Sequence, residues 1–355
     1  MKKIAVFAGS DLRNYGGGEK DIIGWTSRLS DRLDLTVYSL IESGSHRVTK
    51  RFIQESMPGV KIVWYHGLRL RLLKDVLPFR FFNMEKYDKV YSMSQGFILN
   101  NFFMSSARRF LLGIHVQSTL DSEPIESDKL WKRIAFIPYR LVNLHFILNA
   151  DEIRVQNRDD LKALNDLNYK GRIWIVPPRM LKMAPEPVDI GDFRVVWVNR
   201  IAPEKRPEEL AKIAQLCPNV EFRVIGSGNT SAFVDAPHNI VLRGFLSDEE
   251  LSDELRKASA YVSTSRGENF GMSCVEAQMH GLPTIAYDVR GLRDYALYIV
   301  DDAYGAAELI RGLRGSWLLH RDEYMTRRAS IQKEAIARFG DDAVLPQIER
   351  MLEGE

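Results

Sequence analysis

Short apolar runs rich in β-branched residues alternate with longer amphipathic stretches along this 355-residue chain. In the first half, the short runs predict the strands of one parallel sheet: Ile4–Ala8, Leu35–Leu40, Lys61–Trp64, Lys89–Ser92, Phe110–His115, Glu152–Val155 and Ile173–Val176. Helices are predicted at Gly18–Leu33, Ala135–Asn149 and Arg158–Asn165. Strands that alternate with helices imply right-handed crossovers and a doubly wound parallel sheet.

The second half repeats this alternation. Its predicted strands are Arg194–Val198, Glu221–Ile225, Ile240–Leu242, Ala260–Ser263, Thr284–Ala286 and Leu297–Val300. Its predicted helices are Pro207–Leu216, Asp248–Lys257, Ser273–His280, Ala303–Leu313, Arg321–Phe339 and Asp341–Leu352. The proline-rich segment 177–187 separates the halves, and the chain is long enough for two domains. We therefore expect an α/β protein with two doubly wound sheets and domains at 1–183 and 184–340.

The composition excludes several classes of protein. A chain with 45% hydrophobic and 27% charged residues is typical of a soluble globular protein, and a net charge of +2 does not favour nucleic-acid binding. Two cysteines, Cys217 and Cys274, cannot build a disulfide framework and have no metal-ligand spacing, so a reducing cytoplasm is the simplest location. The apolar N-terminal run is too short for a signal peptide, and no apolar stretch is long enough to span a membrane.

One segment combines features of a sugar and phosphate site. Glu268 and Glu276 stand eight positions apart around a Phe-Gly turn, after a predicted strand and at the start of a predicted helix. The free N–H groups and the dipole of a helix N-terminus favour anions, and carboxylates accept hydrogen bonds from sugar hydroxyls. Either glutamate by itself would more often be a solvated side chain.

The motif Glu268-Asn-Phe-Gly-Met-Ser-Cys-Val-Glu276 resembles the donor-site signature of the retaining glycosyltransferases with the GT-B fold, family 4. Four more motifs in the same order strengthen the resemblance. They are the triple glycine Gly16-Gly17-Gly18 after the first strand, Arg200 and Lys205 after a second-half strand, the Gly226-Ser-Gly228 turn, and the segment that begins Gly244-Phe245.

The resemblance implies a role for each motif. Domain 1–183 would bind the acceptor and domain 184–340 the nucleotide sugar, and the segment 341–355 would cross back to the first domain. Arg200 and Lys205 would stabilise the departing diphosphate without a divalent metal, Glu268 would hold hexose hydroxyls and Glu276 the ribose. His115 would lie beside the transferred sugar. The remaining donor-binding residues would be Gly16, Gly17, Gly18, Gly226, Phe245, Asn269, Phe270, Gly271 and Met272.

Two departures from the family pattern affect the donor. The usual Gly-Gly-x-x-Glu turn is replaced by Arg290-Gly291-Leu-Arg-Asp294, and Ser247 precedes Asp248 where some members have an acid that reads guanine. The base is thus left open. The expected reaction moves a hexose from GDP-mannose or a UDP-hexose to a glycan or lipid-linked acceptor, with retention.

Two other function classes remain as alternatives. The first is a sugar-nucleotide epimerase or phosphorylase on the same fold, but epimerases generally lack the glutamate pair and phosphorylases need a lysine-bound cofactor whose motif is not seen. The second is an inactive sugar-nucleotide-binding subunit. The intact set of Arg200, Lys205, Glu268 and Glu276 argues against it.

Two segments of the first half are both basic and strongly apolar. They are Arg69–Phe82 and Trp131–Arg140. Such segments suit an anionic membrane surface or a lipid-linked acceptor, but they also suit core-facing helices with snorkelling arginines. The sequence therefore suggests a cytoplasmic protein with peripheral contact to the inner face of a membrane.

Overall fold

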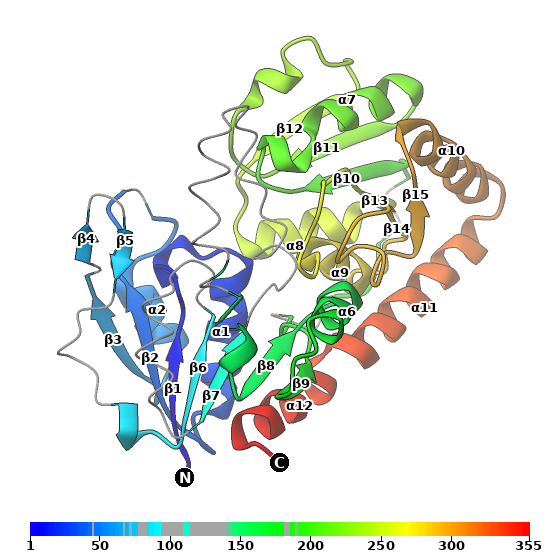
Figure 1. The fold of residues 1–355 in the computed structure, drawn as a ribbon. Helices are drawn as coiled ribbons and strands as arrows, with labels where there is room; N and C mark the ends of the chain where they lie inside the picture. Colours follow the sequence, from blue (N-terminus) through cyan, green and yellow to red (C-terminus); the bar gives the residue numbers. More distant parts are fainter. Residues whose placement is uncertain are drawn as a thin grey trace. The chain divides into compact units, whose positions relative to one another are not determined.

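The chain folds into two α/β units (Figure 1). Met1–Leu181 and Asp341–Glu355 form the first unit, and Lys182–Gly340 forms the second. The boundary lies two residues before the one expected after position 183. The computed structural model describes residues 1–44, 46–66, 68–70, 73–76, 84–93, 109–113, 141, 144–145, 147–180, 185–188 and 191–355.

The first unit is built on a seven-stranded sheet with the order β3-β2-β1-β6-β7-β8-β9. All of its strand pairs are parallel. The strands are β1 (Lys3–Phe7), β2 (Asp34–Leu40), β3 (Lys61–Tyr65), β6 (Lys89–Ser92), β7 (Phe110–Gly113), β8 (Glu152–Val155) and β9 (Arg172–Ile175). Each predicted strand is present. β7 ends before His115, which lies outside the described residues.

Helices cover both faces of this sheet. α1 (Gly17–Leu29) and α2 (Lys50–Ser56) contribute Ile22, Trp25 and Ile53 to one core, and α6 (Arg158–Asp166) contributes Leu164 to the other. The short helices η1 (Leu12–Asn14) and η2 (Met84–Lys86) and the antiparallel pair β4 (Leu68–Leu70) and β5 (Leu73–Val76) complete the described elements. The predicted helix Ala135–Asn149 lies largely outside the described residues.

The last helix, α12 (Asp341–Glu353), belongs to the first unit. Val344, Ile348 and Met351 recur at helical spacing and are fully buried in the same core as α1. The start of α12 is held by Arg179, whose Nε and Nη2 donate to the two oxygens of Asp341 at 2.7 and 2.8 Å. Burial of its apolar face therefore returns the chain to the first sheet.

A buried ion pair holds the point at which the chain leaves the first unit. Arg154 on β8 donates to Asp21 on α1 at 2.9 Å and to the carbonyl oxygens of Val176 and Pro177 at 3.0 and 2.7 Å. The other oxygen of Asp21 accepts the backbone N–H of Arg179 at 2.7 Å. Because both charges are at least 98% buried, each must stay paired with the other.

The second unit has a six-stranded parallel sheet with the order β12-β11-β10-β13-β14-β15. Its strands are β10 (Arg194–Val198), β11 (Glu221–Ile225), β12 (Ile240–Gly244), β13 (Ala260–Ser263), β14 (Thr284–Tyr287) and β15 (Tyr298–Val300). The predicted fold class, two doubly wound parallel sheets, is therefore confirmed.

In the described part of the second unit, five helices accompany this sheet (Figure 1). They are α7 (Pro207–Leu216), α8 (Asp248–Lys257), α9 (Met272–Met279), α10 (Ala303–Leu319) and α11 (Arg321–Phe339), with the short helices η3 (Pro203–Lys205) and η4 (Thr230–Phe233). α7 and α10 pack on one face, and α8 and α9 pack on the other. The strand order reverses between β10 and β13. In open α/β sheets, ligands bind beyond the carboxyl ends of the strands at such a point.

Candidate functional site

The segments that follow β10 and β13 bring two predicted site residues together. Lys205 ends η3, which follows β10, and Glu268 lies in the loop between β13 and α9. The Lys205 ammonium forms an ion pair with Glu268 Oε1, and the two side chains are only 16% and 18% exposed. A partly buried pair of opposite charges thus lies at the switch point of the sheet, the place between β10 and β13 where the strand order reverses.

Two buried hydroxyls hold this pair. Ser265 Oγ donates to Glu268 Oε1 at 2.8 Å. Thr264 Oγ1 contacts the carbonyl oxygens of Lys205 and Arg206 at 2.7 and 3.0 Å, and it accepts a hydrogen bond from Trp197 Nε1 at 3.0 Å. Trp197, Thr264 and Ser265 are completely buried. These three residues were not among the predicted site residues, although hydroxyl side chains directly after a strand and before the glutamate motif could have indicated Thr264 and Ser265.

We expect the Thr264 hydroxyl to position Lys205. Thr264→Val keeps the shape of the side chain but removes the hydroxyl, so the carbonyl of Lys205 and the indole N–H of Trp197 each lose a partner. Thr264→Ser keeps the hydroxyl and loses only the methyl group. Nucleoside diphosphate affinity should fall by about ten-fold in Thr264→Val and much less in Thr264→Ser, as measured by calorimetry.

A double-mutant cycle with Lys205→Ala shows whether Thr264 acts through Lys205. If it does, the loss from Thr264→Val largely disappears in the Lys205→Ala background, because the group that it positions is already gone. Equal losses in both backgrounds would instead show a general effect of Thr264 on the fold.

The turn Arg290–Asp294, which differs from the family pattern, contacts Glu268 through the backbone. The N–H of Glu268 donates to the carbonyl oxygen of Arg290 at 3.0 Å. Gly291 has a φ of +78°, and a Cβ added there would lie 2.3 Å from the carbonyl oxygen of Glu268. The retained glycine therefore lets the chain after β14 lie directly against the glutamate loop.

The loop between Glu268 and α9 is anchored by Phe270. Its side chain is 2% exposed and packs on Tyr295 and Phe339, with ring centroids 4.3 and 5.7 Å apart. The ring therefore stabilises the loop, which leaves the backbone of Phe270 for the predicted donor contact. Gly271 is the N-cap of α9, and Met272 is its first residue. Asn269 and Met272 are half-buried.

Glu276 lies in the second turn of α9 and is half-buried. Its carbonyl oxygen is 2.8 Å from Nδ1 of His280, and Nε2 of that histidine is 2.9 Å from Ser252 Oγ. Burial lowers the pKa of His280. Two residues before Glu276, burial raises the pKa of the Cys274 thiol to about 12, so this cysteine is not a nucleophile at neutral pH. The ribose contact of Glu276 stays a prediction.

Arg200 lies on the surface. It pairs with Glu204, and the two side chains are 65% and 48% exposed. Partial burial by itself would raise the pKa of the Glu204 carboxyl. Hydrogen bonds from its own backbone N–H and from Arg200 outweigh that effect, so the pKa lies below its usual value. Exposed pairs of this kind are weak, so a phosphate is able to compete with Glu204 for the guanidinium.

Gly226 and Phe245 follow the neighbouring strands β11 and β12. Gly226 has a φ of +137°, and a Cβ there would lie 1.9 Å from the carbonyl oxygen of Asn199. The glycine is thus needed for the close approach of two loops, whether or not it contacts a donor. Phe245 is 53% exposed just beyond the carboxyl end of β12, and its donor contact stays a prediction.

The glycine motif of the first unit lies at the start of α1. Gly16 is the N-cap, and Gly17 and Gly18 are in the first turn, so the helix begins one residue before its predicted start at Gly18. Glu19 explains the early start of the helix. Its carboxylate accepts the N–H of Gly16 at 2.9 Å and the hydroxyl of Ser10.

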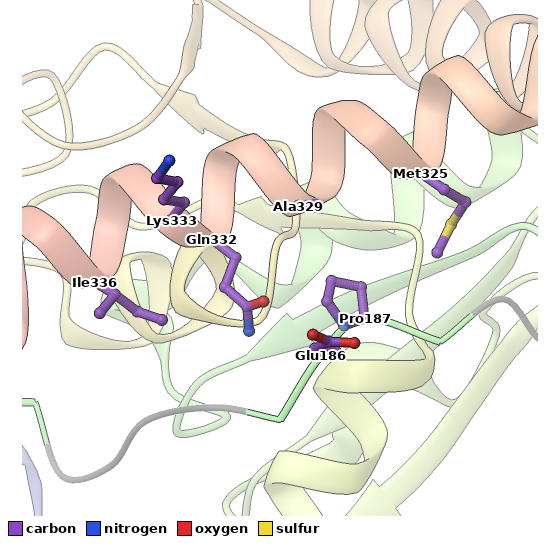
Figure 2. Close-up of a pocket in the computed structure, with 7 residues that line it drawn as sticks. All are labelled: Glu186, Pro187, Met325, Ala329, Gln332, Lys333 and Ile336. Carbon is purple, nitrogen blue, oxygen red and sulfur yellow. The ribbon is translucent and has the colours of Figure 1, made fainter.

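The groove shown in Figure 2 is separate from these residues. It has a volume of about 450 Å³ and is lined by Glu186, Pro187, Met325, Ala329, Gln332, Lys333 and Ile336. Gln332 already donates to the carbonyl oxygens of Pro185 and Met279 at 3.0 and 2.9 Å. None of the predicted site residues lines this groove.

Several expectations concern residues that are not described. His115 and most of the two basic, apolar segments lie outside the described residues. Within the described part of the chain, no cluster of three or more His, Cys, Asp or Glu side chains is arranged to hold a metal ion. No helix in that part is long and apolar enough to cross a bilayer.

Part of the chain is similar to a known protein family and to named proteins. Residues 181–298 match the glycosyl transferases group 1. D-inositol 3-phosphate glycosyltransferase of Mycobacterium sp. (strain KMS) is 30% identical over 230 residues, which cover 59% of this chain and 49% of that protein. The protein of the same name in Mycobacterium sp. (strain JLS) is 33% identical over 230 residues. The match spans about half the length of these relatives.

Solved structures match the whole chain. HepE of Anabaena in complex with UDP-glucose has a TM-score of 0.74 at 15% identity, with 100% of both chains covered. Sucrose-phosphate synthase of Thermosynechococcus elongatus has a TM-score of 0.70 at 17% identity, with 100% of this chain and 99% of that chain covered. The chain therefore has the GT-B fold. Residues 181–298 match the glycosyl transferases group 1, which confirms the resemblance drawn from the motifs in that part of the chain.

Proposed function

We propose that this protein is a retaining glycosyltransferase that moves a hexose from a nucleotide diphosphate sugar to a glycan or lipid-linked acceptor. The observation that carries the proposal is the partly buried Lys205–Glu268 pair at the switch point of a glycosyl transferases group 1 domain. A cation suits the diphosphate of such a donor, and a carboxylate beside it suits the hydroxyls of its sugar.

In the proposed reaction, Lys205 and Arg200 bind the diphosphate and stabilise the charge that grows as it departs. Glu268 accepts hydrogen bonds from the hexose, and Glu276 accepts them from the ribose. The bond between the anomeric carbon and the phosphate oxygen breaks while the acceptor oxygen bonds to the same face of that carbon. The acceptor proton passes to the departing diphosphate, so no protein nucleophile and no divalent metal take part.

The comparisons support a sugar-nucleotide donor. HepE has been solved with UDP-glucose, and the curated relatives are named for transfer to D-inositol 3-phosphate. We accordingly propose a UDP-hexose or GDP-mannose as the donor. The acceptor would be bound by the first unit, with His115 near the transferred sugar.

Donor hydrolysis by the purified chain tests this function. A panel of UDP- and GDP-sugars should include one that is hydrolysed without acceptor, with the same anomeric configuration in donor and released sugar by NMR. Glu268→Gln should abolish most of this turnover. Inversion of the configuration would contradict the retaining mechanism, and hydrolysis of no donor, together with no nucleotide binding, would contradict the enzyme class.

We also propose that the protein contacts the inner face of a membrane in the cytoplasm, through the basic, apolar segments Arg69–Phe82 and Trp131–Arg140. Each lysine or arginine near an anionic surface contributes about 1 kcal/mol, which suffices for reversible binding. In sedimentation with anionic vesicles, the protein should be found in the pellet with the vesicles. Changing Arg69, Arg71, Lys74 and Arg80 to Ser should reduce the fraction in the pellet. Equal recovery with neutral vesicles or at high salt would rule out this contact.

A further inference from the structure

Arg290 lies at the edge of the candidate site. It follows β14, which lies beside β13 in the sheet, and its carbonyl oxygen accepts the N–H of Glu268 at 3.0 Å. The residue is half-buried, and its Nε is buried with no hydrogen-bond partner among the described residues. A buried N–H group of a cation is energetically costly without a hydrogen bond, so a ligand that supplies an acceptor to Arg290 would be stabilised.

The neighbouring arginine behaves differently. Arg293 stands three positions later in the same segment, and its Nε donates to Asp288 at 2.9 Å. Among the described residues, the segment therefore contains one arginine whose Nε is paired and one whose Nε is not. In the family pattern that the glutamate motif resembles, the position of Arg290 is a glycine, so the arginine adds a positive charge beside the glutamate loop.

We infer that Arg290 binds an anionic group of the donor and thereby determines which donors the site accepts. This inference rests on the proposed function. A guanidinium presents parallel N–H groups that match a phosphate or a carboxylate. Two donor groups have this chemistry: the diphosphate common to all nucleotide sugars, and a carboxylate on the sugar, as in a nucleotide-activated uronic acid.

Calorimetric titration of the full chain separates the two sources. The probes are UDP, UDP-glucose and UDP-glucuronate, with GDP, GDP-mannose and GDP-mannuronate as the guanine set. Arg290→Gln keeps a long polar side chain without the charge, and Arg290→Lys keeps the charge without the planar fork. Arg293→Gln is the matched control, because it removes an arginine of the same segment whose Nε is already paired with Asp288.

We expect Arg290→Gln to weaken binding by about ten- to a hundred-fold, with partial recovery in Arg290→Lys and little change in Arg293→Gln. A loss shared by all ligands of one base assigns Arg290 to the diphosphate, and a loss confined to the uronate assigns it to the sugar carboxylate. The inference would be overturned if Arg290→Gln bound every ligand within about two-fold of wild type, or if Arg293→Gln lost as much affinity. Either result would leave the proposed function standing. A wild-type chain that binds none of the six probes would overturn the proposed function as well.

Discussion

Replacing Glu268 by glutamine is expected to lower sugar transfer by about ten- to a hundred-fold while the fold stays intact. The glutamate loses the charge with which it accepts hydrogen bonds from Ser265 and Lys205 and, in the proposed function, from the hexose. A hydrogen bond to a charged group typically contributes about 1.5–3 kcal/mol, which corresponds to that range of rates. The measurement is initial rate at low donor concentration, with circular dichroism to verify folding.

Glu249→Gln provides the control for Glu268. Glu249 is an exposed glutamate in the first turn of α8, so its replacement removes the same charge from the same unit outside the site. It should leave transfer unchanged. Near-normal turnover of a folded Glu268→Gln would remove Glu268 from the mechanism. An equal loss of folded protein in both variants would instead indicate a general sensitivity to charge.

The second large effect is expected at Lys205. Lys205→Ala should weaken nucleoside diphosphate binding by about ten-fold or more, because the ammonium is the partly buried cation at the switch point. Arg200→Ala should have a smaller effect, since its side chain is 65% exposed and its charge is better screened. Calorimetry gives both affinities. Because these cations stabilise the departing diphosphate in the proposed mechanism, a chelator should leave transfer unchanged.

Lys212→Ala is the matched control for Lys205→Ala. Lys212 lies on α7, is 61% exposed and pairs with Glu209 at 2.7 Å, so its loss removes one positive charge without touching the site. Equal affinity losses in the two variants would show only a general electrostatic effect. An absolute requirement for Mn or Mg, abolished by chelation, would contradict the metal-free mechanism.

The errors in the predicted elements have local physical causes. α2 was missed because only Ile53 in Lys50–Ser56 is buried, and one apolar position does not make a helical period. The predicted helix Gly18–Leu33 runs past its observed end at Leu29, because Leu33 is buried in the core after a turn that the apolar pattern does not reveal. The same helix begins at Gly17, one residue before its predicted start at Gly18, because the Glu19 carboxylate accepts the backbone N–H of the N-cap residue Gly16.

The sequence by itself determined the two sheets and the residue types of the candidate site. Buried parallel strands are short, nearly continuous apolar runs, and the glutamate motif combines a strand end with a helix start. The strands and the motif can therefore each be recognised from a few consecutive residues. The tertiary structure alone decided which side chains meet. Lys205 and Glu268 are 63 residues apart, and Thr264 reaches the carbonyl of Lys205 across 59 residues. The burial of the Arg290 Nε without a hydrogen-bond partner in the described part of the chain is likewise apparent only from the fold. Such contacts depend on the order of the strands in the sheet, which no local pattern encodes.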